Sequence, residues 1–311
     1  MRGAPAGLVA VATALSLGAC GSAGGETGSG LPQVAASFYP LAFVAEEVAG
    51  DDAVVTNLTP VGTEPHDLEL TPRQVGRLAE ADLLLYLGQR FQPAIEGAAG
   101  EATNRAVDVL DGLELAALDA DEEADDDHAA EEAEEADEEH GEWDPHVWLD
   151  PIRLGTIATD VGSHLAEIDP DNADGYRERA DDLASRLEEL DAEFEDGLTD
   201  CERTEIVVSH DAFGYLAGRY GLEQVSIAGI DPEAEPSPGR VAEVADFAAV
   251  HGVTTIFFET LVSPDIAETI ANEIGVKTEK LDPLEGPPDG TDYFGAMRTN
   301  LSALRAALGC S

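Results

Sequence analysis

Short runs of apolar and β-branched residues alternate with amphipathic stretches along most of the chain. Eight runs read as strands, four in each half: 34–38, 54–58, 83–87 and 106–110, then 206–209, 225–227, 255–258 and 276–281. Helix starts are marked by a capping residue and a proline at Thr71-Pro72, Asp150-Pro151, Ser237-Pro238 and Ser263-Pro264. Strands that alternate with capped helices are typical of parallel α/β folds. We therefore expect an α/β protein with two similar lobes, each a four-stranded, mostly parallel sheet flanked by helices.

One long helix is predicted between the two halves. The stretch from Asp171 to Leu198 has no proline, and its apolar residues recur every three or four positions. They are Tyr176, Ala180, Leu183, Leu187, Leu190, Phe194 and Leu198. This stripe predicts a helix about 42 Å long that packs along both lobes of a monomer, with a coiled-coil dimer as the alternative. The expected division is an N-terminal lobe over 32–169, a bridging helix over 170–199 and a C-terminal lobe over 200–311.

The N-terminus has the features of an exported lipoprotein. Arg2 precedes an apolar segment, Leu8 to Leu17, that is too short to span a bilayer but suits an export signal. The next residues, up to Cys20, resemble a bacterial lipobox, which predicts removal of residues 1–19 and acylation of Cys20. An ordinary cleaved signal with an incidental cysteine is the alternative. Residues 20–31 fit a flexible linker, so we expect a protein anchored by lipid on the outer face of the cytoplasmic membrane, or a periplasmic one.

The composition is strongly acidic, with a formal net charge of −49. Nucleic acid is therefore a poor partner, because binding it requires a basic surface. A solvated surface in a salt-tolerant organism accounts for the general acidity. The run from Asp119 to Glu142 is different, since it holds 15 carboxylates and two histidines, His128 and His140, without a lysine or arginine. Disorder is expected for such a run.

Two cysteines remain in the folded part, Cys201 and Cys310. In an exported chain an even number favours a disulfide. On the chain-entropy model, closing a loop of this length contributes roughly 4 kcal/mol. Two free thiols are the alternative.

Four candidate metal ligands are placed where open parallel sheets bind ligands, past the carboxyl ends of strands. His66 follows the second predicted strand, His210 the fifth and Asp282 the eighth, while His146 lies between the two tryptophans just before a predicted helix. Each histidine alone is more often a satisfied polar residue than a ligand. Together, three imidazoles and one carboxylate can close a tetrahedral zinc shell, whereas manganese and calcium prefer more oxygen.

Four further acids are candidates for contacts around this shell. Glu259, after the seventh predicted strand, is an alternative fourth ligand or an orienting partner. Asp67 and Asp211 each follow a candidate histidine and could orient an imidazole, or be plain surface acids. Glu64 is a further candidate near His66 and would be a general base, as would Glu259, if the protein were a hydrolase.

Six short motifs carry a resemblance to a known family. They are Ser37-Phe38-Tyr39-Pro40, Pro65-His66-Asp67, the stretch 144–151 around His146, the stretch 209–215 that contains His210, the stretch 233–238, and Leu281-Asp282-Pro283-Leu284. From about Pro32 to the C-terminus the chain resembles zinc-uptake ABC-transporter substrate-binding proteins of the metal-binding, rigid-helix type. The resemblance implies two α/β lobes bridged by one helix, with Zn²⁺ between them. It also implies delivery to a permease membrane subunit with a cytoplasmic ATPase, and no enzymatic activity.

The acidic run departs from that family, whose zinc members have a histidine-rich loop before the second ligand histidine. Carboxylates concentrate divalent cations but select zinc less well than imidazoles. We expect the run to raise the local cation concentration without being required for the main site, so deletion of 121–140 should leave tight binding intact.

Three alternative functions stay open. The first is a manganese or iron receptor of the same family, and the second is a surface adhesion or metal-sensing lipoprotein on the same scaffold. The third is a zinc hydrolase, which would need an open coordination position and a base. The last is disfavoured because the sequence has no His-Glu-x-x-His, no Gly-x-Ser-x-Gly and no phosphate-binding glycine loop.

Overall fold

The computed structural model describes residues 30–101, 105–117 and 143–311. Outside these ranges lie the predicted signal 1–19, Cys20, nearly all of the predicted linker, and the acidic run with His128 and His140. Residues Leu31–Ser311 form one compact unit. Within the described ranges, every helix is too short or too polar to traverse a lipid bilayer.

Two four-stranded sheets form the framework, as the strand pattern predicted. The first contains β1 (Gln33–Ala36), β2 (Val54–Asn57), β3 (Leu83–Tyr86) and β4 (Ala106–Asp108), in the order β2-β1-β3-β4. The second contains β5 (Glu205–Val208), β6 (Glu223–Ser226), β7 (Thr255–Phe258) and β8 (Lys277–Lys280), in the equivalent order β6-β5-β7-β8. All the ladders between these strands are parallel. Their carboxyl ends therefore supply the loops in which ligands are expected.

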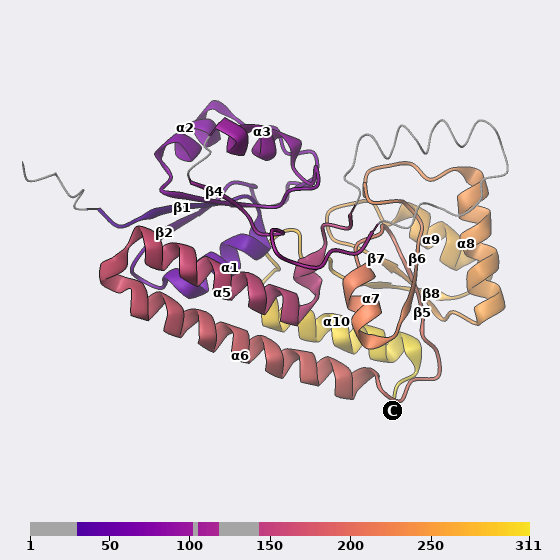
Figure 1. Ribbon diagram of the computed structural model, residues 1–311. Coiled ribbons are helices and arrows are strands. Elements are labelled where there is room, and N and C mark those ends of the chain that lie inside the picture. Colours follow the sequence, from indigo (N-terminus) through magenta and orange to yellow (C-terminus); the bar gives the residue numbers. More distant parts are fainter. Residues whose placement is uncertain (1–29, 102–104, 118–142) are drawn as a thin grey trace, which may run out of the picture. The chain divides into compact units, whose positions relative to one another are not determined.

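Helices connect the strands and cover both faces of each sheet (Figure 1). They are α1 (Tyr39–Ala49), α2 (Pro72–Glu80), α3 (Pro93–Glu101), α5 (Pro151–Ile168), α6 (Ala173–Leu198), α7 (Gly214–Tyr220), α8 (Pro238–His251), α9 (Asp265–Ile274) and α10 (Tyr293–Leu308). Three predicted caps are present, because Thr71, Asp150 and Ser237 each accept hydrogen bonds from the first turn of the helix that follows. The fourth predicted cap, Ser263, is displaced by one residue, because Pro264 occupies the N-cap position of α9. Helix α9 begins at Asp265, and the hydroxyl of Ser263 accepts only from the backbone N–H of Asp265.

The long helix α6 runs beside α5 and α10 and contacts α1 and α7 as well (Figure 1). All seven residues of its predicted apolar stripe are buried. Since this stripe is covered by helices of the same chain, it is not free to form a coiled-coil seam. The prediction of a helix packed along both halves is therefore confirmed.

One apolar core is continuous beneath both sheets. Val34 and Ala36 of β1 belong to the same buried cluster as the α6 stripe and as Ile206 and Val208 of β5. Because successive strand residues point to opposite faces, the residues between them face separate, smaller cores. Those cores lie under α2 and α3 in the first sheet and under α8 and α9 in the second.

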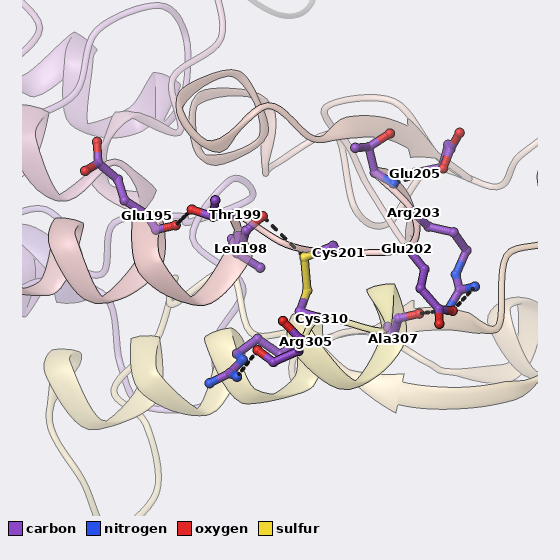
Figure 2. Close-up of a disulfide and its surroundings, with 12 residues drawn as sticks. Glu195, Leu198, Thr199, Cys201, Glu202, Arg203, Glu205, Arg305, Ala307 and Cys310 are labelled. Carbon is purple, nitrogen blue, oxygen red and sulfur yellow. Dashed lines mark hydrogen bonds and ion pairs between the residues drawn. A yellow bond between two sulfur atoms is a disulfide. The ribbon is translucent and has the colours of Figure 1, made fainter.

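A disulfide joins the segments that follow helices α6 and α10. Cys201, three residues after α6, is bonded to Cys310, two residues after α10 (Figure 2). Backbone hydrogen bonds from Glu202 to Leu308 and from Ser311 to Asp200 join the same two segments. The bond is the pairing expected from the sequence, and it closes a separation of 109 residues.

Candidate metal centre

Three imidazoles and one carboxylate converge at the carboxyl ends of the strands. His66 lies between β2 and α2, His146 directly precedes the 3-10 turn Val147–Leu149, and His210 follows β5. Their Nε2 atoms lie 3.3, 3.6 and 3.4 Å from Oε1 of Glu285, which lies between β8 and α10. One ligand atom from each of the four residues falls within 4.8 Å of the others. His146 and His210 are fully buried, Glu285 is 1% exposed and His66 is 7% exposed.

The carboxylate of this cluster comes from Glu285, not from the predicted Asp282. The Asp282 side chain is turned to other partners: Oδ2 accepts from Thr260 Oγ1 at 3.0 Å and Oδ1 from the backbone N–H of Leu284 at 2.9 Å. Asp282 therefore shapes the turn, as aspartate before proline commonly does. Leu284 has φ of 59°, a left-handed conformation that carries the chain round to Glu285.

Hydrogen bonds from two other elements hold this turn. Asn300 of α10 accepts from the N–H of Asp282 at 2.9 Å and donates to its carbonyl at 2.7 Å. The indole of Trp148 donates to the carbonyl of Pro283 at 2.7 Å. Trp148 lies two residues after His146, so the turn that carries Glu285 is fixed to the segment that carries His146.

Two carboxylates orient two of the imidazoles. Nδ1 of His146 lies 2.7 Å from Asp144 Oδ1, and Nδ1 of His210 lies 2.7 Å from Glu259 Oε1. Each carboxylate accepts the Nδ1 proton, so the lone pair of a neutral ring is on Nε2, facing the cluster. Neither Nε2 atom makes a hydrogen bond of normal geometry to any described residue. A histidine whose Nδ1 is held by a carboxylate and whose buried Nε2 has no hydrogen bond is typical of metal ligands.

The other predicted acids contact the surrounding loops. Glu64 accepts from the backbone N–H groups of His66 and Asp67, at 3.1 and 3.2 Å, and so shapes the loop that carries His66. Asp67 shares a hydrogen bond with Glu233, and Asp211 accepts from Gln224. The acid that orients His146 is Asp144, two residues before it, and the sequence analysis missed this residue.

Helix α7 ties the surroundings of His210 to those of His146. The hydroxyl of Tyr215 donates to the carbonyl of Asp144 at 2.8 Å and accepts from the N–H of Ala116 at 3.0 Å. Arg219 forms an ion pair with Asp150, the cap of α5, at 2.7 Å. The segments bearing His146 and His210 are thus fastened to each other through polar contacts.

The electrostatic environments of the imidazoles differ. Burial lowers the pKa of His66, with Glu285 opposing it in part. Burial also disfavours the charged form of His210, but Glu259 and Glu285 outweigh it and raise the pKa of His210 well above its usual value. For His146 the same opposition, with Asp144 and Glu285 as the acids, gives a raised pKa. Burial and the charge of Glu285 raise the pKa of Glu64 to about 8.

A solvent-connected cavity of about 310 Å³ reaches one member of the cluster. Glu285 lines it, together with Val61 from the first half of the chain and Leu261, Lys280 and Asp282 from the second. The cavity therefore borders the four-residue cluster at Glu285, while none of the three imidazoles lines it.

Comparison with known proteins identifies close relatives along nearly the whole described chain. The zinc-uptake complex component A (periplasmic) family matches residues 34–307. The zinc-binding protein AdcA of Streptococcus pyogenes serotype M3 is 34% identical over 288 residues, covering 89% of this chain and 56% of its own length. The high-affinity zinc uptake system protein ZnuA of Bacillus subtilis is 33% identical, covering 88% of this chain and 87% of its own.

The fold has equally similar solved counterparts. The laminin-binding protein Lmb of Streptococcus agalactiae, described as bifunctional with adhesin and metal transporting activity, superposes with a TM-score of 0.79 at 30% identity, covering 90% of this chain and all of that one. This chain spans little more than half the length of its streptococcal AdcA relatives. The relatives are zinc-binding and zinc-uptake proteins and not enzymes. The match over residues 34–307 shows that the chain belongs to the zinc-uptake complex component A family.

Proposed function

We propose that this protein captures Zn²⁺ between its two sheets and delivers it to an ABC-type permease. The observation that carries the proposal is the cluster of three buried Nε2 atoms around one oxygen of Glu285, with two of the imidazoles held by carboxylates. His66, His146, His210 and Glu285 are the ligands in this proposal. The three Nε2 atoms lie 3.3 to 3.6 Å from Oε1 of Glu285. When zinc binds, each of these four atoms would approach the ion to about 2.0–2.2 Å, the length of its bonds to nitrogen and oxygen.

The donor set favours zinc over manganese or iron. Three imidazole nitrogens and one carboxylate oxygen suit an ion that accepts a tetrahedral shell, whereas manganese is better served by more oxygen ligands. The printed names of the AdcA and ZnuA relatives, a zinc-binding protein and a zinc uptake system protein, support the same ion. Four protein ligands also leave no position for a catalytic water, which argues against a hydrolase.

Delivery to a permease is the role that the family implies for a zinc receptor outside the cytoplasm. The permease would have to disturb the ligand geometry to release the ion. Because the core is continuous beneath both sheets and α6 spans it, we propose that release proceeds by loop movements around the cluster and small shifts of the sheets. The lipid anchor at Cys20 would hold the protein beside its permease.

Isothermal titration of the protein with Zn²⁺ tests the binding step. We expect one tight site in the wild type, and a loss of about 3 kcal/mol, a hundredfold in affinity, in Glu285→Gln, since each of four ligands carries roughly a quarter of the binding free energy. The matched control is Asp289→Asn, which removes a charge from the same cavity but lies outside the cluster. A wild type without a tight zinc site, or a Glu285→Gln variant that binds as tightly as the wild type, would refute the proposal.

Zinc accumulation by cells tests the delivery step. In zinc-limited medium, cells that lack the protein should regain zinc uptake with the wild type but not with Glu285→Gln at equal expression. Normal uptake in cells without the protein, or full rescue by the variant, would show that the bound ion is not passed to an importer.

A further inference from the structure

We infer that Phe91 is a selectivity residue, which closes one side of the metal site so that the ion cannot add water ligands from that side. The inference rests on the proposed zinc function and concerns how manganese is excluded.

The loop that carries Phe91 has an unusual backbone. Gln89 and Arg90, the two residues before it, have φ of 61° and 58°, a left-handed conformation that residues other than glycine rarely adopt. Two such residues in succession store strain, which in native proteins is concentrated at functional sites. The strained pair places Phe91 at the carboxyl end of the first sheet, beside the loop that holds His66.

Neighbouring acids keep the loop in this conformation. Asp108 of β4 accepts from the N–H of Gly88 at 3.0 Å and also from Leu110. Gly88 lies so close to this carboxylate that an added Cβ would be 2.2 Å from Oδ2, so a larger residue there would displace the Asp108 side chain. On the other side, the carboxylate of Glu96 accepts from the backbone of Arg90. The fold thus holds Phe91 in place through several independent contacts.

The ring of Phe91 forms a wall behind the two imidazoles of the first half. It is 2% exposed, and its centroid lies 4.5 Å from that of His66, edge to face, and 6.4 Å from that of His146. Phe38 and Trp148 extend the wall, with centroids 4.8 and 5.4 Å from Phe91. On this side the cluster is bounded by aromatic rings.

An aromatic wall restricts the number of ligands around the ion. A bound water needs two to four polar partners and sufficient space, and the rings of Phe91, Phe38 and Trp148 provide neither. Zinc is satisfied by four ligands, but manganese prefers a larger, oxygen-rich shell that includes water. The wall therefore penalises manganese more than zinc, although the four ligands are the same for both ions.

The test compares Phe91→Leu and Phe91→Ala with the wild type by titration with Zn²⁺ and with Mn²⁺, and by the absorption of bound Co²⁺. We expect the ratio of manganese to zinc dissociation constants to fall about tenfold in Phe91→Ala, and less in Phe91→Leu. The Co²⁺ bands should weaken as the ion changes from four ligands to five or six. Phe194→Ala is the control, because it removes an equally buried ring that stacks on Tyr220 and does not touch the cluster.

The outcomes separate this inference from the proposed function. If both Phe91 variants bind zinc and retain the wild-type metal ratio and the wild-type Co²⁺ spectrum, the inference is wrong and the zinc function stands. If Phe194→Ala changes the ratio as much as Phe91→Ala does, general loosening is the cause and the inference is also wrong. A wild type that binds no zinc would instead refute the function itself.

Discussion

His66 and His210 occupy corresponding ends of two sheets with the same strand order, yet their surroundings are opposite. His66 follows an edge strand and is backed by the ring of Phe91. His210 follows a central strand and is backed by the carboxylate of Glu259. The repeated scaffold determines where a ligand lies, and the loops determine whether it is held by an apolar wall or by a charge. The pKa of His66 is accordingly lowered and that of His210 is raised.

Removal of either imidazole should have the largest effect. We expect His66→Ala and His210→Ala each to weaken zinc binding about a hundredfold or more, because each loses one of four ligands. Without metal, His210→Ala should be the less stable of the two variants, because it leaves Glu259 buried without its hydrogen-bond partner. His66 has no such acid on Nδ1 among the described contacts. Calorimetric titration and thermal unfolding of the metal-free variants would measure both. Equal melting temperatures would show that the surroundings of the two imidazoles do not differ in this way.

Neutralising the orienting acids should have the next largest effect. Glu259→Gln and Asp144→Asn keep the size of each side chain but remove the charge that fixes Nδ1, and such changes typically cost 10- to 100-fold in metal affinity, as an order-of-magnitude guide. Competition with a zinc chelator would give the dissociation constants. Glu205→Gln is a suitable control, because it removes an acid beside the exposed His251, away from the cluster. An unchanged affinity in both variants would show that the carboxylates do not hold the imidazoles for a metal.

The dependence of zinc binding on pH should follow His210 and not His66. Since the pKa of His210 is raised, the metal-free protein holds a proton there that zinc must displace, so affinity should rise with pH until that pKa is passed. Stability without metal should run the other way, being greatest below the unfolded pKa near 6.5 and falling as pH rises through the raised value.

Titrations in buffers of different ionisation enthalpy would count the released protons, and dissociation constants from pH 5.5 to 8.5 would give the slope. In Glu259→Gln we expect the pH dependence to move to lower pH, because the acid that raises the pKa is gone. The same profile in Glu259→Gln and in the wild type would assign the proton to a different group.

The smallest effect is expected at Tyr215, which acts only through Asp144. Tyr215→Phe removes the hydroxyl that bridges Asp144 and Ala116, a loss of about 1 kcal/mol, so zinc affinity should fall severalfold. Tyr220→Phe is the matched control, as its hydroxyl bonds Asp191 on α6 instead. Affinity should be measured by chelator competition. A larger loss in the control than in Tyr215→Phe would indicate that α7 acts through packing alone.

Much of the fold was predictable because its signals are local. The spacing of Tyr176 to Leu198 defined α6, and the capping residues Thr71 and Asp150 defined the starts of α2 and α5. The three histidines were found because they follow strands or precede a capped helix, which is where parallel folds place ligands. These inferences need only signals that lie within short segments of the chain.

The fourth member of the cluster was mispredicted for a physical reason. Asp282 follows β8 directly and was the natural choice, but its carboxylate is used by the turn, and the left-handed Leu284 brings Glu285 inward. No periodicity predicts a left-handed leucine. Phe91 was missed for the same reason, because its position depends on the left-handed conformations of Gln89 and Arg90. Asp144 had a weaker signal, its position two residues before His146, where a side chain can reach back to the ring.

The continuous core beneath the two sheets has a consequence for how the molecule melts. The two sheets share one apolar core, and the buried face of α6 is part of it. The disulfide between Cys201 and Cys310 joins the segments that follow α6 and α10. Heat or denaturant should therefore dismantle both sheets in a single cooperative transition. Severing the chain ahead of α6 should leave two fragments that precipitate unless they are allowed to reassociate.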